Sequence, residues 1–456
     1  MWSVRRRPSI ISIKRKKACL TEKLIFPPQA LMQHRNFVWV SLSCGLYWFA
    51  FSLTRPIISL YTASLGIQGI TAGLVLAVYA LLPLLAAIPG GFIADRLGRT
   101  VVLRAGAVLM MASGLLYGVS TGAWILAFAQ LLAGLGQMAV WLAVQVLITE
   151  GPAEGSESRF ATFSLYMAIG QMVAPIVSGF LSDQFGYRTV FAGYTLSSLL
   201  LMLTSWRCRE ESRTPDPAAV SPSPSGGVSV RFRQEETPIS FKVLGLFRQC
   251  LTMVRNRRFA VILLTTFISL FIVDVRTAYL PIHLESLGIS NTRVGLLISV
   301  GALSALFVRP IYPRLMDKLS FRWMLILTYG VSLLLLFAVP LLTNFYAIAA
   351  LVFVTGLALG INQPMTLSMI AGATAQEERG LGIGLRLMSN RAAQLLDPLL
   401  FGFFTAFTSL RTSFLLVGVL LLVCCAFTVQ LYLSSEKEPL SRARTIEKGR
   451  EFQHHG

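Results

Sequence analysis

The chain has 456 residues, of which 54% are hydrophobic and only 13% are charged, and its formal net charge is +19. A soluble globular protein does not need this balance, so the composition indicates a membrane protein. The basic residues lie mostly outside the apolar runs, where anionic lipid and orientation signals explain them better than a nucleic-acid partner does.

The N-terminal segment 1–35 holds nine Lys or Arg residues and one acid, Glu22. It has no apolar core of signal-peptide type, so we predict a basic cytoplasmic tail that faces lipid. Met32 stands just before the first apolar run, and translation from Met1 and from Met32 both fit the sequence.

Twelve apolar runs follow, in two sets of six. Each is near the ~20 residues needed to cross hydrocarbon, so the pattern predicts an all-α membrane protein with twelve transmembrane helices in two six-helix bundles. The runs cover about 37–60, 71–92, 100–119, 123–148, 160–182, 189–206, 259–282, 293–315, 323–342, 345–371, 381–404 and 412–433. We expect bundles at 36–206 and 259–434, a linker at 207–258 and a C-terminal tail at 435–456.

The distribution of basic residues predicts the orientation of these spans. The linker carries ten basic residues against five acidic ones, whereas the loops on the other side hold only Arg188, Arg293 and Arg411. The positive-inside rule then makes both termini cytoplasmic in a protein of the cell (inner or plasma) membrane. Within the linker, Phe241 to Val254 fits either a plain tether or a basic amphipathic helix on the inner leaflet.

An internal repeat runs through the two halves. At an offset of 222 residues, Ser64-Leu65-Gly66-Ile67 matches Ser286-Leu287-Gly288-Ile289. Further matches at offsets of 222 or 223 are Gly73 with Gly295, Asp95 with Asp317, Gly134 with Gly356, Pro175 with Pro398 and Gly179 with Gly402. This register predicts two bundles related by a parallel repeat, an architecture used for alternating access around a site between the halves.

The polar loop after the second run reads Gly91-x-x-x-Asp95-Arg96-x-Gly98-Arg99. With two six-helix halves and a long linker, this loop resembles that of the major facilitator superfamily of secondary transporters. The chain departs from the family at Thr100, where a further basic residue is usual. It departs again in the second copy, where Pro313 and Ser320 replace both glycines.

The resemblance implies a cytoplasmic gate that holds the halves together when the cavity opens outward. Its residues would be Gly91, Asp95, Arg96, Gly98 and Arg99, with Asp317 from the second copy. Asp95 would then face the N-terminus of span eleven near Gly380, where the helix dipole favours an anion. A loop that serves only as a topological anchor is the alternative.

Five ionisable residues lie well inside the predicted spans: Arg55, Asp274, Arg276, Arg391 and Asp397. Arg309 and Arg386 lie near the inner ends of their spans, where an arginine can reach the membrane surface. Each of the five costs ~2.5–3.5 kcal/mol at the membrane centre on insertion scales, so we expect them to be paired or hydrated. Such residues are candidates for a substrate or proton pathway.

The spacing of these charged residues suggests which of them binds a proton. Asp274 and Arg276 are separated by about 200° around a helix and cannot share a face. We hypothesise an Arg276–Asp397 pair, which leaves Asp274 to bind and release a proton. Asp274 pairing instead with Arg391, and a purely structural network of all four residues, are the alternatives.

A second group of residues is expected to line the substrate cavity. Arg55 shares a stripe of the first span with Trp48, and there it would favour an anionic substrate unless it reaches the outer interface. Gln137, Trp141 and Gln145 lie on one side of span four, and Asn362 and Gln363 lie in span ten. Hydrogen bonds between helices are the alternative role for the polar members of this group.

Span five reads Gly170-x-x-x-Ala174-Pro175-x-x-Ser178-Gly179. It is similar to the small-residue motif of antiporters in the family, although close helix packing explains it equally without efflux. We find no nucleotide-binding, metal-binding or hydrolase motif, and the six cysteines show no metal spacing. We therefore expect neither an enzyme nor a bound cofactor.

The sequence thus predicts a monomeric secondary transporter that moves a small molecule by alternating access. Proton-coupled efflux of a drug or metabolite is the favoured function. Proton-coupled uptake of a small organic anion is the second candidate, supported by the arginines in the spans. A receptor or scaffold of the same fold that transports nothing is the alternative of a different class.

Overall fold

The computed structural model describes residues 28–87, 96–149, 156–210, 248–308, 310–374 and 379–453, and the regular structure in these ranges is helical. We call residues 28–210 of this set the N-half and residues 248–453 the C-half. The N-half contains α2 (Pro28–Ser64), α3 (Gly69–Ala86), α5 (Arg99–Val119), α6 (Ala123–Thr149), α7 (Ser156–Phe185) and α8 (Tyr187–Ser205). The C-half contains α10 (Arg257–Ser286), α11 (Asn291–Val308), α12 (Tyr312–Lys318), α13 (Phe321–Ala338), η1 (Val339–Leu341), α14 (Phe345–Ala373), α15 (Arg379–Phe407) and α16 (Leu410–Gln453).

Within the described ranges, ten helices are long and apolar enough to cross a membrane. The expected all-α membrane fold is therefore confirmed. Two further helices, α8 with 19 residues and α15 with 29, have sufficient length but do not belong to these ten. The predicted total of twelve spans stays a prediction.

The repeat seen in the sequence is present in the packing. In the N-half, α2 packs on α7 and α8, α3 on α6, and α5 on α6 and α8. The equivalent pairs in the C-half are α10 with α15 and α16, α11 with α14, and α13 with α14 and α16. Gly66 and Gly288 occupy equivalent turns with the same φ of +75°, a conformation that favours glycine.

The two halves meet through α3 with α15, α7 with α11, and α2 with α10. The first two contacts are equivalent in the repeat and rest on glycine. A Cβ added to Gly73 would lie 2.4 Å from the Pro398 carbonyl oxygen, and one added to Gly295 would lie 2.0 Å from that of Pro175. Both contacts therefore require a residue without a side chain, and the span-five motif takes part in close packing between the halves.

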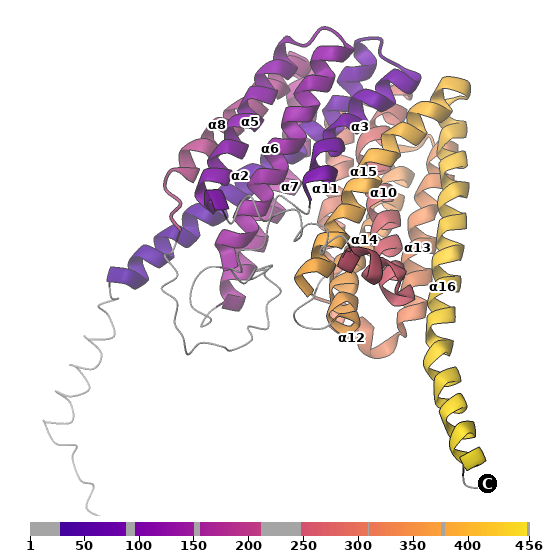
Figure 1. Ribbon diagram of the computed structural model, residues 1–456. Helices are drawn as coiled ribbons and strands as arrows, with labels where there is room; N and C mark the ends of the chain where they lie inside the picture. The colour runs from indigo at the N-terminus through magenta and orange to yellow at the C-terminus, as the bar shows by residue number, and fades with distance from the viewer. Residues whose placement is uncertain are drawn as a thin grey trace, which may run out of the picture.

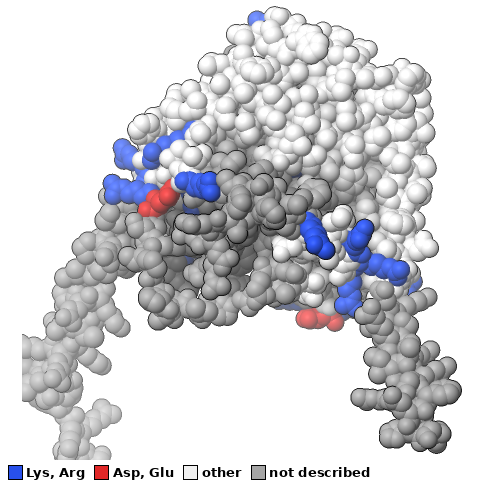
Figure 2. Space-filling model, viewed as in Figure 1, with Lys and Arg blue, Asp and Glu red and all other residues white. Residues whose placement is uncertain are grey.

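The halves do not meet evenly along their length. Figure 1 shows them side by side and diverging toward the end at which α2 begins and α16 ends. We call this the linker end and the other the opposite end. Figure 2 shows most of the visible basic side chains gathered toward the linker end, which is the charge asymmetry expected from the sequence.

Candidate functional site

An ion pair joins the two halves between α2 and α10. The guanidinium of Arg55 donates a hydrogen bond from Nη2 to Oδ1 of Asp274, and the two side chains are 15% and 6% exposed. The other carboxylate oxygen, Oδ2 of Asp274, is buried without a hydrogen-bond partner among the described residues. Sequence reasoning had placed both residues in the spans but had not paired them.

Aromatic rings hold the arginine of this pair. The Arg55 guanidinium carbon lies 5.0 Å from the ring centre of Tyr79 and 5.6 Å from that of Phe51, distances typical of cation–π contacts. The Tyr79 hydroxyl in turn donates a hydrogen bond to the side-chain oxygen of Gln137. The charge therefore lies between a carboxylate and two ring faces in the protein interior.

Asp397 and Arg276, two further candidates for the proton site, do not pair as hypothesised. Asp397 on α15 is 1% exposed, and its Oδ1 has no hydrogen-bond partner in the described part of the chain. Its carboxylate interacts electrostatically with Asp274 and Arg55. The structure records no ion pair between Asp397 and Arg276 in these ranges, so the expected Arg276–Asp397 pair is wrong.

The reason is that Arg276 points toward a different helix. A Cβ added to Gly301 of α11 would lie only 2.8 Å from Nη1 of Arg276, so the missing side chain creates the room for the guanidinium. Gly301 is the repeat equivalent of Tyr79, 222 residues later. Asp274 and Arg276 thus face different neighbours, as their spacing predicted.

An aromatic cluster lies on the same stripe of α2. Tyr47 stacks on Trp141 of α6 with ring centres 5.7 Å apart, and Trp48 meets Trp141 edge-on at 5.2 Å. Trp48 and Trp141 are half-buried. Arg391 of α15 is also half-buried, donates a hydrogen bond of 2.7 Å to Gln394, and lies within electrostatic reach of Tyr47 and Asp274.

The remaining cavity candidates divide into two groups. Gln137 and Asn362 are buried and make hydrogen bonds between helices, Asn362 with the Thr265 carbonyl at 3.3 Å and with the Ser269 hydroxyl. Gln145 is half-buried and Gln363 is exposed. The first two therefore make hydrogen bonds between helices of the kind that the sequence left open as an alternative, and a cavity role for the group stays a prediction.

The expected gate is described only in part. Gly91 and Asp95 lie outside the described residues, whereas Arg96, Gly98, Arg99 and Asp317 lie within them. Gly98 has a φ of +90° and precedes α5. Asp317 is exposed in the last turn of α12.

Glu210 at the start of the linker caps the helix that follows the gate motif. Its Oε1 accepts hydrogen bonds from the backbone N–H of Thr100 at 2.7 Å and from the Thr100 hydroxyl at 3.1 Å. A carboxylate is favoured there by the helix dipole. The threonine that departs from the family pattern thus has a partner of its own.

The segment 206–210 is bound to the linker end of the N-half. Asn36 and Arg209 exchange two hydrogen bonds of 2.8 and 2.9 Å. The Arg104 guanidinium lies 5.2 Å from the Trp206 ring centre. Burial raises the pKa of Cys208 to about 11, which is the main effect on this thiol.

At the opposite end, Asp183 of α7 binds the first residues of α11. Its Oδ1 accepts a hydrogen bond from the N–H of Asn291 at 3.0 Å. Its Oδ2 accepts one from the N–H of Thr292 at 2.8 Å and one from the Thr292 hydroxyl at 2.6 Å. Sequence reasoning missed this residue, although a lone acid beside a turn in a charge-poor region was a usable signal.

A second polar contact lies beside it. The Tyr187 hydroxyl donates a hydrogen bond of 2.8 Å to Oε1 of Glu285. Burial, followed by this hydrogen bond, raises the pKa of Tyr187 to about 12. The phenol therefore keeps its proton and its donor role throughout the physiological pH range.

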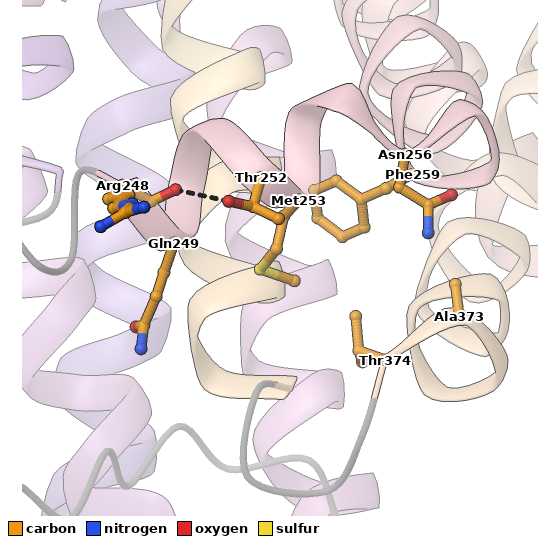
Figure 3. A pocket seen from close by; sticks show the side chains of 8 residues that line it. All are labelled: Arg248, Gln249, Thr252, Met253, Asn256, Phe259, Ala373 and Thr374. Atoms are coloured by element: carbon orange, nitrogen blue, oxygen red, sulfur yellow. Dashed lines mark hydrogen bonds between the residues drawn. The ribbon is translucent and has the colours of Figure 1, made fainter.

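A cavity of about 470 Å³ lies at the linker end, and the Arg55–Asp274 pair does not line it (Figure 3). It lies between the helical residues 248–255, the start of α10 and the end of α14, as Figure 3 shows. Its lining residues are Arg248, Gln249, Thr252, Met253, Asn256, Phe259, Ala373 and Thr374. None of the predicted site residues lines it.

Two repeat-related helical halves with an ion pair between them have the construction of a secondary transporter. The family model described as Major Facilitator Superfamily matches residues 40–285 and 262–454, and the chain belongs to this superfamily. The resemblance noted in the sequence is thereby confirmed.

Relatives and solved structures agree with this assignment. The chain is 28% identical over 352 residues to the "Multidrug resistance protein MdtG" of Citrobacter koseri, covering 74% of this chain and 80% of that protein. It is 27% identical over 335 residues to the protein of that name from Proteus mirabilis, covering 71% and 77%. A crystal structure of the nucleoside transporter NupG superposes with a TM-score of 0.70 at 12% identity, covering 87% of this chain and all of the other. A POT family transporter in complex with a thioalcohol-conjugated peptide gives 0.69 at 14% identity, covering 88% and 96%.

Proposed function

We propose that the protein exports a small organic compound in exchange for protons, by alternating access between two six-helix bundles. The buried Arg55–Asp274 pair between the halves is the observation that carries this proposal. The name of the relatives, multidrug resistance protein, and the antiporter-like motif of span five support export.

The proposal includes twelve spans with both termini in the cytoplasm. α8 packs on α2 and α5, and α15 packs on α3 and α10, so both run among helices that qualify as spans. The ionisable residues that make α15 less apolar, Arg391 and Asp397, lie toward the protein interior. The basic linker end faces the cytoplasm by the positive-inside rule.

With this orientation, the halves are closed on the outer side and diverge on the cytoplasmic side. Gly73, Gly295 and Asp183 make their contacts between the halves toward the outer side. This arrangement fits the state in which an exporter takes up its substrate from the cytoplasm. The alternate state requires these outer contacts to separate.

Asp274 is the proposed proton site, because its Oδ2 is buried without a hydrogen-bond partner among the described residues and is therefore free to take up a proton. Protonation removes the negative half of the ion pair and leaves Arg55 without its hydrogen-bonded anion, which loosens α2 from α10. Asp397 is the second carboxylate of the site, and it lies within electrostatic reach of Asp274 and Arg55. The proton gradient then drives the cycle, since a membrane potential supplies about 2.3 kcal/mol per charge per 100 mV.

Uptake of a small organic anion remains the second candidate. Arg391 favours it, because its hydrogen bond goes to the neutral Gln394 and a half-buried guanidinium there suits an anion. In that case a proton on Asp274 would raise the local positive charge and favour binding of the anion. Proton and substrate would then move together and not in exchange.

The test is the internal pH of proteoliposomes that contain the full chain, measured when candidate compounds are added. Wild type is compared with Asp274→Asn and with Glu285→Gln, which neutralises a carboxylate outside the proposed site. Compound-dependent proton movement that is lost only in Asp274→Asn supports the proposal, and the direction of proton flow separates export from uptake. Full coupling in Asp274→Asn would refute the proton site, and no flux with any compound would favour a receptor.

A further inference from the structure

The hydrogen bonds of Asp183 cross from one half of the chain to the other. Asp183 lies in the last turn of α7 in the N-half, and Asn291 and Thr292 begin α11 in the C-half. The first N–H groups of a helix have no partner within it, and the helix dipole favours an anion there. A carboxylate from the other half therefore supplies a cap that exists only while these two helices are in contact.

The surroundings of Asp183 show how close this contact is. A Cβ added to Gly179, one turn earlier on α7, would lie 2.2 Å from the Asn291 carbonyl oxygen. Further along the same interface, the Ser299 hydroxyl donates a hydrogen bond of 2.6 Å to the Met172 carbonyl oxygen. Asp183 thus closes the end of an interface that is packed along its length.

The repeat provides an internal comparison. At offsets of 223 and 222 residues, the equivalents of Asp183 and Asn291 are Ala406 and Gly69. A Cβ added to Gly69 would lie 3.2 Å from the Cβ of Ala406, so the second interface brings the same two positions together. There, however, the position of the carboxylate holds a methyl group, and the N-cap residue of α3, Gln68, makes no side-chain capping bond.

We propose that Asp183 is a positioning residue for transport, which sets the balance between the two alternating states by capping α11 across the halves at one of two repeat-related interfaces. This inference rests on alternating access and goes beyond the proton and substrate roles. Since the cap is broken in the alternate state, its whole contribution acts on the equilibrium between states. At the α3–α15 interface, the described residues include no such side-chain cap.

The test measures the distance between the halves at the opposite end in purified full-length protein without substrate or pH gradient. Spin labels at positions 188 and 411, one in each half, are read by double electron–electron resonance after the native cysteines are replaced. Asp183→Ala should lower the ratio of closed to open protein by about 2- to 30-fold, the range expected for loss of a helix cap. Gln184→Ala, an exposed neighbour on the same helix, is the matched control and should leave the ratio unchanged.

A gain of contact gives a second and independent readout. Ala406→Asp places a carboxylate at the equivalent position beside the start of α3, and it should raise the ratio of closed to open protein. Combined with Asp183→Ala, it should restore much of the wild-type ratio, which a variant that merely disturbs folding would not do. An unchanged ratio in Asp183→Ala, or no effect of Ala406→Asp, would overturn the proposal. The outcome is separate from the proposed export, because the distance is measured without any compound or proton flux.

Discussion

Arg55 and Asp274 stand on the first helix of each half and form their ion pair where α2 meets α10. A buried pair adds little net stability, but removing one partner leaves an uncompensated buried charge. We expect Arg55→Gln to lower the unfolding free energy by about 3–5 kcal/mol and the double variant Arg55→Gln/Asp274→Asn to lower it by much less. Thermal unfolding of the purified protein measures both, and losses that simply add would contradict a direct pair.

The glycines at the two repeat-related interfaces allow the halves to close, so replacing them should hinder closure. Gly73→Ala and Gly295→Ala each place a methyl group within 2.4 Å or less of a proline carbonyl oxygen of the other half. Overpacking of this kind costs about 1–3 kcal/mol, and here it acts on the closed state alone. The distance measurement between positions 188 and 411 should therefore shift toward the open state.

Gly118→Ala is the control for this pair, because an added Cβ there meets no atom within 4 Å. It should leave the balance of states unchanged without loss of stability, since alanine favours a helix more than glycine does. An equal shift in all three variants would mean that the effect belongs to the helices themselves.

Gly301 should be essential for the position of Arg276. The Cβ of Gly301→Ala would lie 2.8 Å from Nη1 of Arg276, so the guanidinium must move within a packed site. We expect a loss of about 1–3 kcal/mol in thermal unfolding. Shortening the side chain in Gly301→Ala/Arg276→Ala should remove the clash, and a double variant no better than the sum of its parts would argue against this contact.

Cys208 should react slowly with maleimides, because only the thiolate is the nucleophile and the pKa is raised to about 11 by burial. The rate should rise about tenfold per pH unit between pH 7 and pH 10, since the thiolate fraction does so below the pKa. Mass spectrometry of the peptide around Cys208 follows the reaction. Asn36→Ala, which removes both hydrogen bonds to Arg209, should accelerate it at every pH.

Sequence reasoning found what periodicity and duplication encode. The offset aligned Gly73 with Gly295 and Pro175 with Pro398. The structure shows the corresponding equivalent contacts, in which Gly73 meets Pro398 and Gly295 meets Pro175. The spacing of Asp274 and Arg276 correctly separated their faces. The charged candidates named from the sequence include Arg55 and Asp274, the two residues that form the ion pair.

The partners of the charges were harder to predict, because pairing depends on the space left by residues elsewhere. Arg276 has room to turn toward α11 because the C-half has Gly301 at the position where the N-half has Tyr79. Nothing in the local sequence pattern of α10 signals this. Gln137 and Asn362 looked alike as polar residues in spans, yet neighbouring helices supply their hydrogen-bond partners. Asp183 and Glu210 were missed because each caps a helix that is distant in sequence.

The contacts of residues 206–210 bear on how the protein is made. Glu210 binds Thr100 and Arg209 binds Asn36, so the N-half attaches its own last described residues to its earlier helices. Domains fold as units during synthesis, beginning at the N-terminus. The first half can therefore complete its packing in the membrane while the ribosome is still translating the linker, and α3 and α7 then offer a preformed surface on which the newly inserted α11 and α15 assemble.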